Sequence, residues 1–248
     1  MTPERIDVRG VCFHNVTPSE ASSFLRERTA RGETTAVCTP NAEIVQMCLE
    51  DASLRELINR AELVVADGVG VVKAARILGT PLKGKVAGVD LGRSVLAFAA
   101  EDGLSVYFLG GKPGVAQTAA QRMTEACPGL CIAGTHDGYF DKSGAENDAV
   151  VAEIEASGAK ILYVCLGAPA QERWIAQNRA RLPGVQIFLG LGGSLDVYAG
   201  AVKRAPKIFI KLGLEWFYRL LREPRRIGRM MRLPKFYFGT WKYKFSRK

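Results

Sequence analysis

Six short apolar runs, rich in Val, Ile and Leu, recur along the chain and constrain its fold more than any other feature. Such continuous runs are typical of strands that are buried on both faces of a parallel sheet. Stretches with helical periodicity alternate with them. The alternation predicts an α/β fold with a mostly parallel, Rossmann-like sheet and helices on both faces. The expected strands cover residues 34–39, 61–66, 104–110, 130–135, 159–167 and 185–190, and the expected helices 42–50, 69–78, 89–100, 114–126, 145–157 and 169–181.

The 248-residue chain fits one large domain with an appendage, and several features bear on where it works. Its first residues, "MTPERIDVRG", lack the apolar core of a signal peptide. The longest uncharged run, residues 182–195, is shorter than the ~20 residues that a membrane-spanning helix needs. The six cysteines form no CxxC pair, which favours reduced thiols. We therefore expect a protein that is made and kept in the cytoplasm.

Positive charge is concentrated at the C-terminal end. The net charge is +9, but residues 202–248 carry +13 and residues 1–201 carry −4. The same end holds ten of the 21 aromatic residues. Leu212, Trp216 and Leu220 follow a helical spacing there. The sequence thus predicts an α/β domain, 1–201, and a basic, aromatic, helical C-terminal appendage, 202–248.

The composition of this appendage fits three roles. Basic residues interleaved with aromatic ones bind single-stranded nucleic acid. The same residues suit an anionic membrane surface, where Trp and Tyr settle at the interface. A solvated basic extension without a partner is the third role. Composition alone does not choose among them.

In a sheet of this kind, ligands bind beyond the carboxyl ends of the strands, so the loops after the strands are where chemistry is expected. Thr39 and Asn41 flank Pro40, where the first strand ends and a helix begins, and Asp67 follows the second strand. Plain helix capping is the alternative explanation for these residues. The pair Gly68 and Gly70 matches a dinucleotide fingerprint only in part, which leaves an NAD-dependent oxidoreductase as an alternative.

Three further loops after strands contain glycine. "FLGGKPGVA" carries Gly110 and Gly111 at the point where a strand gives way to a helix, an arrangement that suits a phosphate. "LGAPAQERWI" and "GLGGSLDVYAG" follow the last two strands. No D-x-D motif is present, and the two histidines stand at no ligand spacing, so no metal site is expected.

Taken together and in order, these motifs resemble the WecG/TagA/CpsF family of bacterial glycosyltransferases, glycosyltransferase family 26. The resemblance runs from about residue 11 to about residue 226. It rests on "TPNAEIV", "ADGVGVV", "VAGVDL", "FLGGKPGVA", "DGYF", "LGAPAQERWI", "GLGGSLDVYAG", "KRAP" and "GLEWFYRLLREPRR".

The resemblance implies an inverting glycosyltransferase that uses neither metal nor cofactor. Such enzymes move a sugar from a UDP-sugar to a polyprenyl-diphosphate-linked saccharide in cell-surface polysaccharide or teichoic acid synthesis. N-acetylmannosamine is the first expectation for the sugar, with glucose or a uronic acid as alternatives. The lipid-linked acceptor favours the membrane over nucleic acid as the partner of the appendage. It also implies a peripheral position on the inner face of the plasma membrane. The oligomeric state stays open.

The resemblance also assigns roles to residues. Asp67 of "ADG" becomes the catalytic base, and Thr39, Asn41 and Gln171 belong to the same catalytic pocket. The family commonly has Arg where this chain has Lys85, which keeps the charge but loses the bidentate fork. Arginines of the appendage are expected to close over the site and bind the diphosphate: Arg219, Arg222, Arg225 and Arg226. The residues expected to hold the UDP are Gly110, Gly111, Tyr139, Gly192, Gly193 and Asp196.

Overall fold

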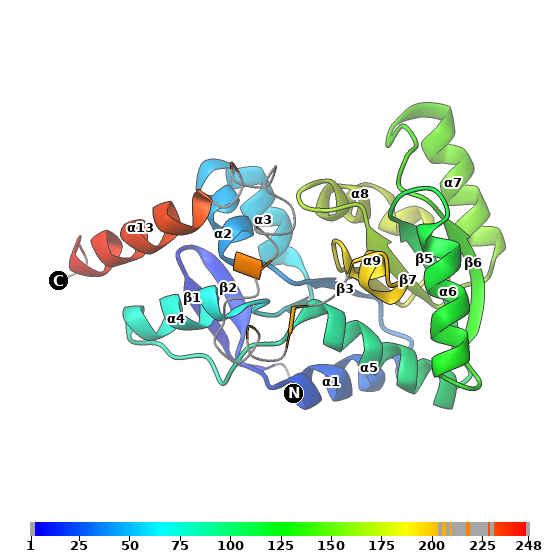
Figure 1. The fold of residues 1–248 in the computed structure, drawn as a ribbon, viewed down its shortest axis with the longest axis horizontal. Coiled ribbons are helices and arrows are strands. Elements are labelled where there is room, and N and C mark those ends of the chain that lie inside the picture. Colours follow the sequence, from blue (N-terminus) through cyan, green and yellow to red (C-terminus); the bar gives the residue numbers. More distant parts are fainter. Residues whose placement is uncertain are drawn as a thin grey trace.

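The computed structural model describes residues 3–202, 205, 206, 209, 217, 218, 228 and 231–246. Within them, six parallel strands form one sheet in the order β4-β3-β8-β7-β5-β6, which confirms the predicted α/β class (Figure 1). Every strand of this sheet overlaps a predicted apolar run. The strands are β3 (Thr35–Cys38), β4 (Leu63–Val64), β5 (Ser105–Gly110), β6 (Cys131–His136), β7 (Ile161–Cys165) and β8 (Ile187–Gly190).

The predicted helices are present with nearly the predicted bounds. They are α2 (Ala42–Glu50), α4 (Val69–Leu78), α5 (Gly88–Glu101), α6 (Val115–Ala126), α7 (Gly144–Ala156) and α8 (Ala170–Asn178), the last continued by a 3-10 turn, Arg179–Arg181. The described part of the chain also contains helices that were not predicted: α1 (Pro18–Ala30), α3 (Ala52–Arg60) and α9 (Ser194–Tyr198). Helix α13 (Arg232–Ser246) lies in the appendage that was predicted to be helical, although its bounds were not predicted.

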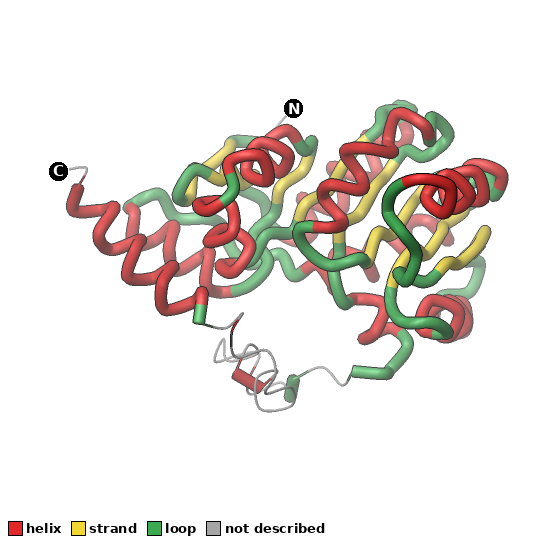
Figure 2. Tube along the Cα trace, turned by 90° about the horizontal axis from the view of Figure 1, so that it is seen from above, coloured by secondary structure: helices red, strands yellow, loops and turns green. Residues whose placement is uncertain are grey.

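Both faces of the sheet are covered, which explains why its strands read as continuous apolar runs (Figure 2). Side chains alternate along each strand. In β5, Tyr107 and Leu109 join a core that includes α2, α3, α4, α7 and α8. Val106 and Phe108 join a second core on the other face, with α1, α5, α6 and α9.

A small antiparallel hairpin, which the sequence pattern did not predict, precedes the sheet. It pairs β1 (Arg5–Val8) with β2 (Val11–His14). Arg9 and Gly10 form the turn with φ values of 60° and 87°, the backbone of a type I′ turn. His14 anchors the hairpin to the sheet, because its Nδ1 accepts a hydrogen bond of 2.9 Å from the amide of Val64.

The last described helix, α13, packs on α2 and α4 at one end of the molecule (Figure 1). Phe236 and Thr240 are fully buried in this contact. Lys235 Nζ lies 2.6 Å from Glu50 of α2, and the Arg9 guanidinium of the hairpin lies 5.2 Å from the Tyr243 ring centre. Part of the predicted appendage is thus fastened to the α/β domain through its last helix.

None of the helices in the described residues combines the length and the apolar character that crossing a bilayer requires. All six cysteines are free thiols. Cys38, Cys48 and Cys165 are buried, whereas Cys131 is exposed.

Candidate active site

Because all six strands are parallel, their carboxyl ends meet at one edge of the sheet. The loops after β4, β3, β8 and β7 follow one another along this edge, and the loops after β5 and β6 continue it. The structure therefore brings the predicted site residues of six separate loops to one edge. Those residues are Thr39, Asn41, Asp67, Gly110, Gly111, Tyr139, Gln171, Gly192 and Gly193.

Asp67 lies on a segment that is held between two others. Its amide donates to the carbonyl of Pro40 over 3.2 Å, and the amide of Val86 donates to the carbonyl of Ala66 over 2.9 Å. Lys85 therefore stands on the segment next to Asp67. Helix α4 begins at Val69, Gly68 is its N-cap residue, and no side chain caps it. Capping thus does not account for the half-buried Asp67.

Asn41 does cap a helix. Its Oδ1 accepts a hydrogen bond of 3.0 Å from the amide of Ile44. Helix capping, the alternative explanation for this residue, therefore accounts for the side-chain oxygen of Asn41. A Cβ at Gly68 would lie 3.9 Å from Asn41 Cβ. The Asn41 side chain is therefore a direct neighbour of the turn that carries Asp67.

Thr39 connects the loop after β3 with the end of β8. Its Oγ1 donates to the carbonyl of Gly190 over 3.0 Å, and the side chain is buried. The same oxygen would lie 3.2 Å from a Cβ at Gly88, the first residue of α5. The hydroxyl of Thr39 thus holds the main chain of the site together.

Gln171 lies beneath the loop after β8, and only 2% of it is exposed. Its Oε1 accepts a hydrogen bond of 2.9 Å from the amide of Gly192. Its Nε2 donates to Glu172 Oε1, also over 2.9 Å. Both polar atoms of the amide are therefore engaged within the protein.

Sequence reasoning missed Glu172, which directly follows Gln171. It is buried, and its Oε2 has no hydrogen-bond partner in the described structure. Burial raises the pKa of this carboxyl group. The signal in the sequence was an acid within a helix stretch, "QERWI", whose neighbours Trp174 and Ile175 face the core.

The loops after β5 and β6 form the glycine-rich part of the edge. A Cβ at Gly110 would overlap the carbonyl of Cys165, so this close approach requires glycine. The amide of Gly138 donates to the carbonyl of Gly111 over 2.8 Å. Lys142, another residue that sequence reasoning missed, donates from Nζ to the carbonyls of Gly138 and Phe140 over 2.5 Å each.

Lys142 thus supports the loop from which Tyr139 projects, and 70% of Tyr139 is exposed. Helices α4, α6, α7 and α8 begin at this edge without a side-chain cap. Amides of uncapped first turns favour an anion. Asp196 lies in the first turn of α9, where its Oδ2 would be 3.5 Å from a Cβ at Gly193.

The remaining predictions concern the appendage and metals. Arg219, Arg222, Arg225 and Arg226 lie outside the described residues. Within the described part of the chain, no three side chains among His, Cys, Asp and Glu gather as metal ligands.

Comparison with known proteins gives the family. Residues 6–248 match the model of the glycosyl transferase WecG/TagA/CpsF family. Relatives include proteins of Staphylococcus aureus strains MRSA252, MW2 and NCTC 8325, each named N-acetylglucosaminyldiphosphoundecaprenol N-acetyl-beta-D-mannosaminyltransferase. Each is 36% identical over 242 residues, which is 97% of this chain and 93% of the relative.

The match extends to the last residue, beyond the stretch on which the motif resemblance rested. It confirms a glycosyltransferase and decides against the NAD-dependent oxidoreductase that the partial glycine pattern left open. The names of the relatives support action on a sugar linked to a polyprenyl diphosphate. The chain therefore belongs to the WecG/TagA/CpsF family of glycosyl transferases.

Proposed function

We propose that this enzyme transfers N-acetylmannosamine from a UDP-sugar to a polyprenyl-diphosphate-linked N-acetylglucosamine, with inversion and without a metal ion. The sugar and the acceptor follow the names of the relatives. The observation that carries the proposal is the position of Asp67 at the carboxyl edge, between the loops of Asn41 and Lys85 and without a capping role. Glucose and uronic-acid donors are the alternatives.

Asp67 acts as the general base in a single displacement. An acceptor hydroxyl oxygen bonds to the anomeric carbon while the bond from that carbon to the diphosphate oxygen breaks. The electron pair leaves with UDP, and the proton of the hydroxyl passes to the Asp67 carboxylate. The relatives are named for a β-linked product, and UDP-hexose donors commonly carry an α linkage. A single displacement inverts the configuration at the anomeric carbon and therefore converts an α-linked donor into a β-linked product.

The leaving diphosphate gathers negative charge, so groups that stabilise it lower the barrier. Lys85 precedes Val86, whose amide is hydrogen-bonded to the carbonyl of Ala66, and the uncapped first turn of α4 starts two residues after Asp67. Both support binding of the diphosphate at this point. In our proposal, Arg219, Arg222, Arg225 and Arg226 add further charge when the appendage closes.

The donor nucleotide occupies the glycine-rich part of the edge. Gly110 and Gly111 let the diphosphate approach the backbone, and the exposed Tyr139 ring offers a face on which uracil stacks. Gly192, Gly193 and Asp196 complete this side. Thr39 and Gln171 act mainly by fixing the main chain around Gly190 and Gly192, given that their polar atoms bond there.

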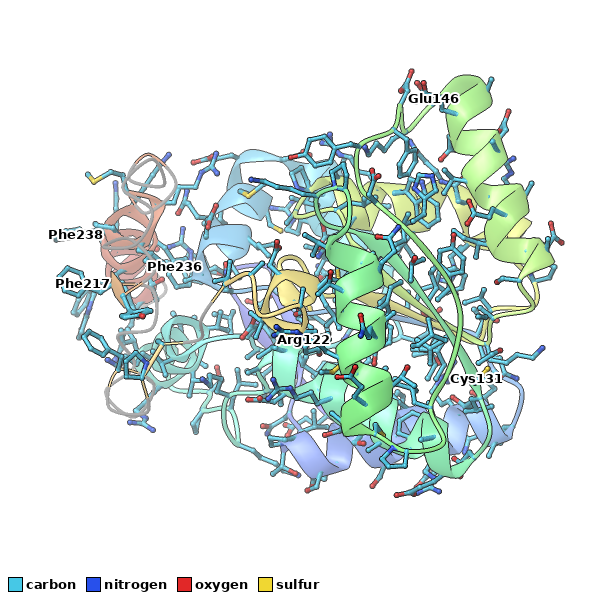
Figure 3. All side chains as sticks on the ribbon, turned by 45° about the vertical axis from the view of Figure 1, so that its right-hand side comes forward. Arg122, Cys131, Glu146, Phe217, Phe236 and Phe238 are labelled. Atoms are coloured by element: carbon cyan, nitrogen blue, oxygen red, sulfur yellow. The ribbon has the colours of Figure 1, made fainter. Side chains whose placement is uncertain are left out.

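Helix α13 brings the enzyme to the membrane, where its lipid-linked acceptor resides. Phe238, Trp241 and Phe245 are exposed at i, i+3 and i+7 and form an outer aromatic stripe. In Figure 3, Phe238 points away from the body of the molecule, whereas the buried Phe236 lies on its inner side. Exposed Lys242 adds charge that attracts anionic headgroups. This stripe favours the inner face of the plasma membrane over nucleic acid.

The proposal is tested by Asp67→Asn with a panel of UDP-sugars and a short-chain lipid diphosphate acceptor, with products identified by mass. We expect UDP-N-acetylmannosamine to be used by the wild type. In the variant, kcat should fall about 100-fold or more at an unchanged Tm, since amides are not bases. Asp148→Asn, an exposed change on α7, is the matched control and should keep the wild-type rate. A variant at position 67 with the full wild-type rate would contradict the assignment of the base.

A further inference from the structure

Glu172 is a buried acid for which the proposed mechanism has no use. It is 5% exposed, and its Oε2 lacks a hydrogen-bond partner in the described structure. The thiols of Cys38 in β3 and Cys48 in α2 are near enough to interact with its charge. The carboxyl group thus lies in the core between β3, α2 and α8.

Such a group is costly for the fold. A buried carboxyl oxygen without a partner loses its hydration and gains nothing in return. Stability alone would favour a methionine or a leucine here. What the carboxyl group does provide is one acceptor, Oε1, for the Nε2 of Gln171 over 2.9 Å.

That acceptor decides which way the Gln171 amide points. The amide has two orientations, which exchange its donor end and its acceptor end. The observed one turns Oε1 toward the amide N–H of Gly192 over 2.9 Å. The flipped orientation would place the NH₂ group of Gln171 against the backbone N–H of Gly192, so that two donors would face each other. An ionised carboxylate accepts hydrogen bonds and never donates them, so it is compatible with the observed orientation alone.

The orientation matters because Gln171 holds the end of β8. Its Nε2 would lie 3.1 Å from a Cβ at Gly190, and its Oε1 binds Gly192. Thr39 Oγ1 holds the carbonyl of Gly190 over 3.0 Å from the loop after β3. Two side chains therefore fix residues 190–192, the segment between the proposed donor site and the loop of Asn41.

We propose that Glu172 is a positioning residue, which locks the Gln171 amide in one orientation and so holds the loop after β8 in the geometry that transfer requires. This inference rests on the proposed function for its effect on the rate. Its effect on the loop is independent of that function. A displacement of groups at a reacting centre by about 1 Å costs up to about 100-fold in rate.

The test exchanges the two side chains. Gln171→Glu sets two carboxylates face to face and should lower kcat/KM by about 10- to 100-fold. Adding Glu172→Gln restores the pair in reverse, since the new amide at position 172 can donate to the new carboxylate at position 171, which still accepts from Gly192. The double variant should therefore recover at least tenfold over Gln171→Glu alone. Glu172→Met should lose activity, whereas Glu172→Gln alone should retain most of it.

A second measurement needs no substrate. Hydrogen exchange of the Gly192 amide should be faster in Glu172→Met and Gln171→Glu and near the wild-type rate in the double variant. Asn147→Leu is the control. This substitution removes the buried hydrogen bond of 2.7 Å that Asn147 of α7 accepts from Trp174 of α8, the helix that also carries Glu172. It should lower Tm without changing the rate of hydrogen exchange at the Gly192 amide.

The two measurements separate the possible failures. If the double variant shows no recovery and exchange at Gly192 is unchanged in every variant, Glu172 is a buried acid without a positioning role. If the wild type transfers no sugar but the exchange pattern holds, the proposed function is wrong and the lock on Gln171 stands.

Discussion

Gly70 in α4 lies so close to Ala42 in α2 that a Cβ at Gly70 would be 2.9 Å from Ala42 Cβ. Helix α2 starts directly after Asn41, and α4 starts directly after Asp67 and Gly68. The contact between the two helices therefore sets the separation of the Asn41 and Asp67 side chains. On its other side, the hydroxyl of Tyr237 from α13 would lie 3.4 Å from the same Cβ.

Gly70→Ala should force α2 and α4 apart. We expect a loss of about 1–3 kcal/mol in the free energy of unfolding, as for other overpacked sites. We also expect kcat/KM to fall more than tenfold, because the base moves relative to Asn41. Gly184→Ala is the matched control, since a Cβ there meets no atom within 4 Å. Wild-type kcat/KM in Gly70→Ala would mean that this spacing does not control the site.

Stability should fall between pH 6.5 and pH 4 because of His14. Burial, and then the charge of Arg5, lower the pKa of His14 from 6.5 to about 4. In that window the unfolded chain binds a proton that the folded chain does not, so stability is lost as the pH falls. We expect a loss on the order of 1–2 kcal/mol at pH 5, allowing for partial screening by solvent.

His14→Gln is the variant that isolates this effect. An amide oxygen can accept the hydrogen bond from Val64 without titrating. The drop in Tm from pH 7 to pH 5 should therefore be smaller in the variant, by about 2–6 °C for a chain of this size. Thermal unfolding followed by circular dichroism measures it. Equal drops in both proteins would exclude His14 as the source.

Transfer should survive removal of divalent metals. The proposed mechanism stabilises the leaving diphosphate with Lys85, backbone amides and the arginines of the appendage. We expect at least half of the wild-type rate in excess EDTA, measured on the same donor and acceptor. A rate that vanishes in EDTA and returns with Mg²⁺ would overturn this part of the proposal.

The outer aromatic stripe of α13 should be needed for membrane binding. Replacement of Phe238, Trp241 and Phe245 by Ser should abolish sedimentation with anionic liposomes, because these side chains face solvent rather than the core. Activity on a short-chain, water-soluble acceptor should remain. Tyr139→Ser, which removes an exposed aromatic ring elsewhere, should leave sedimentation unchanged. Undiminished sedimentation of the triple variant would contradict the role of the stripe.

The local pattern of hydrophobic residues was enough to predict the strands of the parallel sheet. Each of its strands is a short apolar run, and α2 and α4 have the bounds that periodicity predicted. The hairpin was not predicted because its turn has Arg9 at φ 60°, whereas the sequence that usually indicates such a turn is Asn-Gly. The appendage was predicted to be helical, but the bounds of α13 were not predicted, because Pro234 and Gly239 weaken its local helix signal. Its stability comes from burying Phe236 against other helices.

The sequence by itself determined the fold class, the family resemblance and the identity of Asp67 as a residue after a strand, since these depend on neighbours along the chain. Only the tertiary structure decided which loops meet. The strand order β4-β3-β8-β7-β5-β6 sets Thr39 against Gly190, 151 residues away. It also turned Gln171 inward onto Glu172 and Gly192. Hydrophobic periodicity predicts that a residue faces a core, but the residues that it contacts there depend on how distant segments pack.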